Sequence, residues 1–212
     1  MMRRMRSVFC LAVATFAALP LVGTPAVAGT VTVQVRDAAG APVADAVVTA
    51  HLQGRPTPAP RAVADLAIEQ KLIQFNPYVL VVPVGSTVAF PNRDKVRHHV
   101  YSFAAAKKFE LKLYGQEQNR SVLFDKPGIV PLGCNIHDAM SGFVAVVDTP
   151  YAAKTDAQGT ARLTVPDGAA TIDVWHPRLR APGGRVARPA KIGGASTEAF
   201  AVALRPAGQG TR

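Results

Sequence analysis

The stretch that decides the fold reads GIVPLGCNIHDAMSGFVAVV and spans residues 128–147. It holds two apolar, strand-like runs, one ending near Leu132 and one running from Gly142 to Val147. Only nine residues separate these runs, and Gly residues lie at both ends of the gap. The pattern predicts two β-strands joined by a tight loop.

The loop carries three side chains that bind soft metals. Cys134, His137 and Met140 follow one another at three-residue steps. Thiolate and thioether favour copper(I), whereas imidazole serves both oxidation states of copper. The alternative is a buried Cys, an exposed loop His and a core Met with no shared role. A second imidazole from elsewhere in the chain decides between the two interpretations.

That imidazole comes from His98 or His99, which follow an apolar β-like run at 79–90 that Pro83-Val84-Gly85 interrupts. Side chains alternate between the two faces of a strand, so only one of two adjacent His can point into a shared interior. His98 shares a face with Val100 and His99 lies on the opposite face, so we expect one of the two His to be structural. Two His and one Cys with a distant Met are typical of an electron-transfer copper site.

The N-terminus has the pattern of a secretory signal peptide. Arg3, Arg4 and Arg6 precede an apolar stretch at 8–22, and Ala26-Val27-Ala28 predicts cleavage before Gly29. A membrane anchor is the alternative, but Pro and Gly residues interrupt the stretch before about 20 apolar residues accumulate. We expect a periplasmic or secreted protein with no integral membrane segment after signal removal.

Cleavage changes both the charge and the cysteine content. It lowers the formal net charge from +10 to +7, because 21 Lys and Arg then face 14 Asp and Glu. It also removes Cys10 and leaves Cys134 as the one cysteine. Cys134 therefore has no internal disulfide partner in an oxidising compartment, which is consistent with a metal ligand.

Residues from about 66 to 148 resemble the cupredoxin family, whose members include amicyanin and plastocyanin. Val84-Gly-Ser-Thr-Val88 resembles the family's V-G-D-T-V turn and strand, and Asn92-Arg93 precedes a His at the usual interval. Cys134 follows Gly128 by six residues, as in the family. The resemblance implies an all-β chain with a Greek-key β-barrel or sandwich around one mononuclear type 1 (blue) copper.

The same resemblance assigns roles to four residues. It implies that Cys134 is the thiolate ligand, His98 and His137 are the imidazoles, and Met140 is the weak axial thioether. Two positions depart from the family: His99 stands where Asn is usual, and Arg97 replaces a Pro beside the first ligand. Asp138 also lies within a loop in which apolar residues are common, and it is interpreted as a solvated carboxylate.

The histidine content limits the chemistry. A type 3 dinuclear copper centre needs more imidazoles than the five of this chain, which are His51, His98, His99, His137 and His176. We therefore expect a non-enzymatic carrier of single electrons between periplasmic redox partners, such as a dehydrogenase or a cytochrome. The alternative is a copper-binding module for storage, delivery or surface assembly.

The flanking segments resemble a carboxypeptidase-regulatory-like domain, a small prealbumin-type β-sandwich. A strand, a turn at Asp37 to Ala41 and another strand precede the copper region, and further strands at 154–165 and 166–175 follow it. About a hundred residues separate the two parts, so we expect the copper domain to be inserted into the sandwich. The expected organisation is a signal peptide at 1–28, the first part of the sandwich at 29–60, the copper domain at 61–149, the second part of the sandwich at 150–206 and a tail at 207–212.

The remaining polar segments are interpreted more simply. The run from Arg178 to Lys191, rich in Arg, Pro and Gly, is predicted to be a solvated loop. His51 and the Trp175-His176 pair are interpreted as structural. No nucleic-acid partner is expected, because the cations are not interleaved with aromatic residues. A sequence cluster of cations close to His98 has two interpretations, a soluble face by default or a surface that steers an acidic redox partner; it comprises Lys95, Arg97, Lys107 and Lys108.

Overall fold

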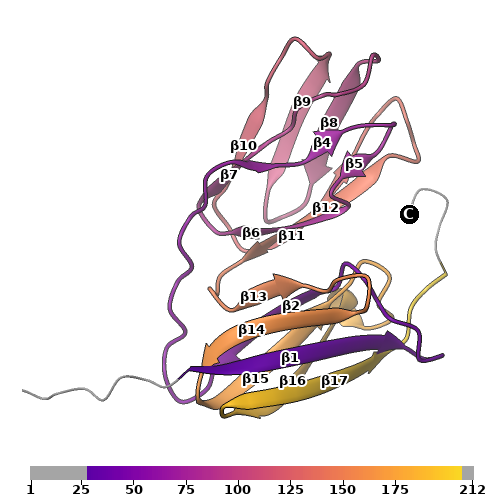
Figure 1. Ribbon diagram of the computed structural model, residues 1–212. Coiled ribbons are helices and arrows are strands. Elements are labelled where there is room, and N and C mark those ends of the chain that lie inside the picture. The colour runs from indigo at the N-terminus through magenta and orange to yellow at the C-terminus, as the bar shows by residue number, and fades with distance from the viewer. Residues whose placement is uncertain (1–27, 207–212) are drawn as a thin grey trace, which may run out of the picture.

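The computed structural model describes residues 28–206, and the predicted signal peptide lies almost wholly outside this range. Two stacked β bodies make up the described chain (Figure 1). The lower body contains β1 (Ala28–Asp37), β2 (Val47–Leu52), β13 (Ala152–Lys154), β14 (Thr160–Pro166), β15 (Gly168–Trp175), β16 (Arg185–Ile192) and β17 (Ala195–Val202). The upper body contains β3 (Leu66–Ala67), β4 (Glu69–Gln70), β5 (Phe75–Asn76), β6 (Val79–Pro83), β7 (Ser86–Ala89), β8 (His98–Phe103), β9 (Lys108–Tyr114), β10 (Ser121–Phe124), β11 (Gly128–Gly133) and β12 (Ser141–Val147). The predicted all-β class is confirmed, and no helix within residues 28–206 is long and apolar enough to span a membrane.

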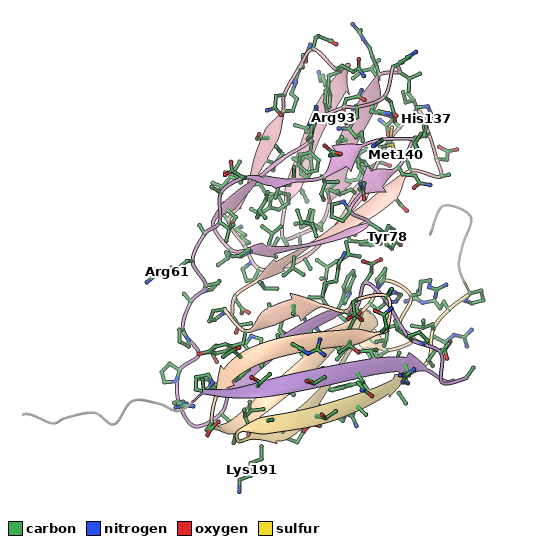
Figure 2. All side chains as sticks on the ribbon, in the orientation of Figure 1. Arg61, Tyr78, Arg93, His137, Met140 and Lys191 are labelled. Atoms are coloured by element: carbon green, nitrogen blue, oxygen red, sulfur yellow. The ribbon has the colours of Figure 1, made fainter. Side chains whose placement is uncertain are left out.

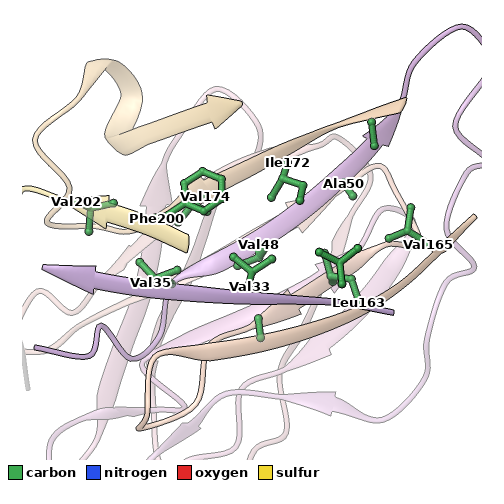
Figure 3. Close-up of a cluster of buried hydrophobic side chains, with 14 of the residues drawn as sticks. Val33, Val35, Val48, Ala50, Leu163, Val165, Ile172, Val174, Phe200 and Val202 are labelled. Carbon is green, nitrogen blue, oxygen red and sulfur yellow. The ribbon is translucent and has the colours of Figure 1, made fainter. Parts of the chain in front are cut away.

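The lower body is a sandwich of two sheets, with strand orders β14-β1-β17 and β13-β2-β15-β16. Alternation along β1 turns Val31, Val33 and Val35 inward, and all three are fully buried. They pack against apolar side chains of the second sheet, among them Val48 and Ile172 (Figure 3). Strands from both flanks of the upper body thus share one core.

The segment after β1 crosses from one sheet to the other. Asp37 closes the predicted turn at 37–41: its backbone N–H donates to the Ala41 carbonyl, and its carboxylate accepts from the Ala39 and Ala41 amides. β1 then pairs with β14 and β17, whereas β2 pairs with β13 and β15. The two strands therefore face each other across the core and do not form a hairpin.

The prediction of a solvated loop from Arg178 to Lys191 is wrong in its second half. A short 3₁₀ turn, η1 (Pro182–Gly184), leads into β16, which pairs antiparallel with the whole of β15. β16 is an edge strand, where a Pro such as Pro189, which has no N–H to donate, is tolerated. Five of the eight residues of this strand are exposed, three of them charged and one a Pro, which concealed the strand in the sequence.

The upper body consists mainly of a five-stranded sheet, with order β6-β12-β11-β8-β9, and a three-stranded sheet, with order β10-β7-β3. The predicted strands on either side of the Cys134 loop are β11 and β12, which pair antiparallel from Gly128↔Val146 to Gly133↔Ser141. Buried residues from both sheets form its core, which includes Phe90, Val100, Phe124, Val130 and Val144. The loop therefore begins and ends on two hydrogen-bonded strands.

A third apolar cluster joins the two bodies. Trp175 at the end of β15 makes a T-shaped contact with Phe143 of β12, at 5.5 Å between ring centroids. Val47 of the lower body and Val79 of the upper body are buried in the same cluster. The Lys154 ammonium also donates to the Val79 carbonyl at 3.1 Å. The sandwich thus packs against β6 and β12 of the five-stranded sheet.

Candidate metal centre

The loop between β11 and β12 holds three of the four predicted ligands at the end of the upper body that points away from the sandwich. Within it, the Met140 amide donates to the His137 carbonyl at 2.8 Å and closes the last turn before β12. Figure 2 labels His137 and Met140 close together at this end. Because the strands on both sides are paired, the two ends of the loop are held next to each other.

The side chain of His98, at the start of β8, lies next to this loop. The Cys134 Sγ lies 4.0 Å from the His98 Nδ1 and 3.8 Å from the His137 Nδ1. The three ligand atoms all lie within 4.8 Å of one another, and this is the one such cluster of His, Cys, Asp or Glu within residues 28–206. The two imidazole rings are 5.0 Å apart between centroids.

These separations fit a shared metal ion. Nitrogen and sulfur atoms bound at about 2.0 and 2.3 Å to one ion, in a trigonal or tetrahedral arrangement, are about 3.5 Å apart. The observed distances exceed this by a few tenths of an ångström, so a small inward movement of each side chain suffices. A thiol with two imidazoles, one of which is fully buried, is a donor set suited to copper or zinc.

Met140 lies in the same buried core cluster as Cys134, and the exposed fractions of the two residues are 2% and 4%. The thioether is therefore kept away from solvent near the thiol. Its role as an axial ligand remains a prediction.

His99 points away from this cluster. Its Nε2 lies 2.8 Å from the Glu110 carboxylate on β9, and its ring stacks at 5.6 Å on Tyr101. Strand alternation predicts that only one of the two His faces the shared interior, and the structure brings His98, not His99, to Cys134. A register irregularity in the pairing of β8 with β9 falls between His98 and Val100.

Behind His98 lies a carboxylate to which the sequence analysis gave no role. The Asp94 Oδ2 lies 2.8 Å from the His98 Nε2. Burial raises the pKa of Asp94, but hydrogen bonds from the Ile73 amide, His98 and the Leu72 amide outweigh burial and hold that pKa below its usual value. The spacing of four residues between Asp94 and His98 was the one available signal.

Exposed apolar side chains lie next to the metal cluster. Four large hydrophobic residues of this end are exposed and form what we call the apolar rim: Leu72, Ile73, Val96 and Ile136. Lys95 and Arg97 are exposed beside Val96.

The remaining predicted cations lie elsewhere. Phe103, at the far end of β8 from His98, pairs with Lys108, and Lys107 binds the Asp125 carboxylate at 2.9 Å. Five strand residues span about 17 Å, so Lys107 and Lys108 are remote from the metal cluster. The expectation of one cluster of four cations near His98 is therefore wrong. The extended strand β8 places residues that are close in sequence at opposite ends of the upper body.

The His residues outside the upper body have structural partners. His51 lies 3.0 Å from Asp148 and links β2 to the segment after β12. His176 is buried, and its Nδ1 accepts from the Arg178 amide at 3.2 Å. Burial, together with the nearby charge of Arg178, lowers the pKa of His176 to about 4. Its neutral ring is thus part of the fold of the lower body.

Two packed β sheets that gather a thiol, two imidazoles and a buried thioether at one end define an all-β chain with a candidate mononuclear metal centre. No family model and no curated protein matches the chain. Solved structures that are similar to it include cupredoxins and a copper-containing nitrite reductase.

A purple cupredoxin from Nitrosopumilus maritimus is 24% identical, with 39% of this chain and 100% of that chain covered and a TM-score of 0.36. A reduced amicyanin variant is 26% identical, covers 47% of this chain and 99% of its own, and has a TM-score of 0.36. A copper-containing nitrite reductase from Thermus scotoductus SA-01 is 27% identical, with 44% of this chain and 27% of the reductase covered and a TM-score of 0.38. Less than half of this chain is aligned in each case, so the centre is argued from its own side chains.

Proposed function

We propose that this chain is an exported type 1 copper protein that transfers single electrons between periplasmic redox partners. The observation that carries the proposal is the approach of the Cys134 Sγ to the Nδ1 atoms of His98 and His137, at 4.0 and 3.8 Å. When bound there, copper would supply a one-electron couple between its two oxidation states. One ion per chain is proposed, because one such cluster lies within residues 28–206.

Each residue would supply a different ligand atom to the centre. His98 and His137 offer imidazole lone pairs, Cys134 offers a thiolate, and Met140 offers a weak axial sulfur. The ladder between β11 and β12 keeps the loop in one shape, which limits the movement that accompanies each electron. Four side chains of this chain fill the proposed coordination shell, and so we propose a carrier and not an enzyme.

We also propose the domain organisation behind this centre: a copper domain at 61–149, inserted between sandwich segments at 29–60 and 150–206. The support is the sharing of sheets between the two flanks. β1 pairs with β14 from Ala28↔Pro166 to Gln34↔Thr160, and it pairs in parallel with β17. The apolar cluster around Trp175 then fixes the sandwich to the copper domain.

We propose that electrons pass through the end of the upper body that carries His137. His137 is half-buried there and directly follows the exposed Ile136 in the loop, whereas Cys134 is buried. The apolar rim suits a partner that docks transiently through an apolar patch, and the cations Lys95 and Arg97 suit an acidic one, such as a dehydrogenase or a cytochrome.

Copper(II) titration of the purified chain tests the function. We expect an intense blue thiolate-to-copper band at one equivalent, with reversible one-electron reduction. Cys134→Ser should abolish the band, whereas the matched control His99→Ala should keep it. A Cys134→Ser variant that stays blue contradicts the ligand assignment. Colourless, tightly held copper(I) favours the storage or delivery module.

A further inference from the structure

The Asp94 carboxylate is held from three directions. Its Oδ2 lies 2.8 Å from the His98 Nε2 and accepts from the Ile73 amide at 2.9 Å. Its Oδ1 accepts from the Leu72 amide at 2.7 Å. The Asp94 amide in turn donates to the Asn92 side-chain oxygen at 2.8 Å. Only 13% of the Asp94 side chain is exposed, so these contacts are made largely out of water.

This geometry determines which nitrogen of His98 carries the proton. An ionised carboxylate only accepts hydrogen bonds, so the His98 Nε2 must be the donor. A neutral imidazole has one N–H, and its other nitrogen keeps a lone pair. The Nδ1 is therefore the free nitrogen, and it is the atom that faces the Cys134 Sγ at 4.0 Å.

We propose that Asp94 is a positioning residue for the metal centre, which holds His98 in the tautomer and orientation that present Nδ1 to the metal and lowers the reduction potential of the bound ion. The inference rests on the proposed function for its second part only. A carboxylate that shares the imidazole proton makes the ring a stronger electron donor, which stabilises the more oxidised metal.

The same carboxylate ties the apolar rim to this ligand. Leu72 and Ile73 both have positive φ, at 56° and 57°, in a turn whose ends are closed by mutual hydrogen bonds between Lys71 and Gln74. Bulky residues seldom adopt this conformation. Asp94 accepts from both of their amides, and so it holds the two apolar side chains out toward solvent next to the centre.

The neighbouring imidazole supplies a built-in control. The Glu110 carboxylate lies 2.8 Å from the His99 Nε2, the same contact that Asp94 makes with His98. Glu110 is 55% exposed, however, and His99 points away from Cys134. Glu110→Gln thus removes the same kind of carboxylate from an imidazole outside the centre.

Asp94→Asn is the informative variant, because it keeps the size of the side chain and removes its charge. The Asn NH₂ group must face either the Leu72 amide, on the Oδ1 side, or the Ile73 amide and the His98 Nε2, on the Oδ2 side. In both orientations the His98 N–H loses its charged acceptor, so the Nε2 proton is held less strongly and the Nδ1-protonated form, which blocks the nitrogen that faces Cys134, gains population. We expect copper(II) affinity to fall by about 10- to 100-fold, as is usual when the partner of a metal-binding His is lost.

Nitrogen NMR of the metal-free chain at neutral pH tests the first part. We expect His98 to carry its proton on Nε2 in the unmodified chain and in Glu110→Gln, and to gain the Nδ1-protonated form in Asp94→Asn. A His98 that is protonated on Nδ1 in the unmodified chain overturns the inference, even if Asp94→Asn does not fold. This measurement needs no copper, so it stands apart from the proposed function.

Voltammetry of the copper-loaded chains tests the second part. We expect a higher reduction potential for Asp94→Asn and an unchanged one for Glu110→Gln. Blue copper with the same potential in Asp94→Asn overturns the tuning role while leaving the carrier function intact. Failure of the unmodified chain to form a blue site, with Nε2-protonated His98 still observed, overturns the function and leaves the positioning role.

Discussion

At the scale of single residues, Gly133 shows how closely the chain next to Cys134 is packed. A Cβ added at Gly133 would lie 2.7 Å from the Cζ and 2.8 Å from the hydroxyl of Tyr101, which covers this backbone. We expect Gly133→Ala to lower the free energy of unfolding by about 1–3 kcal/mol, the usual cost of overpacking. Urea unfolding measures it.

Two further variants make the Gly133 measurement specific. Gly193→Ala is the matched control, because a Cβ at Gly193 meets nothing within 4 Å. Adding Tyr101→Ala to Gly133→Ala should remove the clash, so that the effects of the two substitutions are not additive. Simple additivity would contradict the packing argument.

His176 should make stability depend on pH. Its pKa is about 4 in the folded chain, below the 6.5 of a free His, so the unfolded chain binds more protons between these values. The stabilisation is complete above pH 6.5 and is lost as the pH falls toward 4. Across this window we expect a loss of up to about 3 kcal/mol.

His176→Asn isolates this contribution, because an amide oxygen can still accept from Arg178 but does not titrate. Urea unfolding of both chains from pH 4 to pH 7 should give a difference that narrows as the pH falls. A difference that stays constant over this range would assign the pH dependence to other groups.

The grouping of Cys134 with His98 and His137 could be predicted from the sequence, whereas the carboxylate of Asp94 behind His98 could not. Soft side chains at three-residue steps, and the alternation that separates His98 from His99, are local properties of the chain. The contact of Asp94 with His98 depends on the path of residues 92–97, where the Asn92 side chain donates to the carbonyls of Val96 and Tyr114. That path is set by a distant strand, and no local pattern records it.

At the scale of elements, the turn at 156–160 fastens the sandwich. The Gly159 amide donates to the Asp156 carbonyl at 2.9 Å, and the Gly159 carbonyl accepts from the Val35 amide at 2.7 Å. Gly159 has a φ of 72°, and a Cβ there would lie 2.9 Å from the Val43 amide nitrogen and still closer to the Val35 carbonyl oxygen. Both obstacles are backbone atoms, which cannot rotate away.

We therefore expect Gly159→Ala to destabilise the chain much more than Gly40→Ala. Gly40 has a φ of 82° but open space around it, so its substitution costs only the conformational penalty of about 1–2 kcal/mol. Thermal unfolding of the two variants measures the difference. Equal losses would mean that the crowding at Gly159 is relieved by movement of the turn.

Strands were predicted correctly where the sequence is strongly apolar. A strand was missed where its formation depends on pairing with a neighbouring strand. β11 and β12 are apolar enough to be recognised from sequence, whereas β16 carries Arg185, Arg188, Pro189 and Lys191. Its existence depends on the continuous ladder with β15. The same limit concealed the parallel pairing of β1 with β17, since residues so far apart in sequence leave no local trace of their register.

At the scale of the whole molecule, Trp175 couples the two bodies. The residue is buried, and its ring packs on Phe143. We expect Trp175→Ala to cost about 3–5 kcal/mol and to separate the unfolding of the two bodies in calorimetry. Leu123→Ala, at an exposed position of β10, is the control. A single transition in Trp175→Ala would show that other contacts suffice for the coupling.

The charge of the chain should govern how it meets redox reagents. Lys95 and Arg97 are exposed near the centre, whereas Lys108 on β9 lies beside Phe103, about 17 Å along β8 from His98 and beyond the Debye length of about 10 Å at 0.1 M salt. Oxidation of the copper-loaded, reduced chain by the anion ferricyanide should slow as salt increases, and oxidation by a cationic cobalt complex should accelerate. Lys95→Glu combined with Arg97→Glu should flatten both slopes, and Lys108→Glu should leave them nearly unchanged. If Lys108→Glu has the larger effect, electrons leave through the opposite end of the upper body, and the apolar rim is not the docking surface.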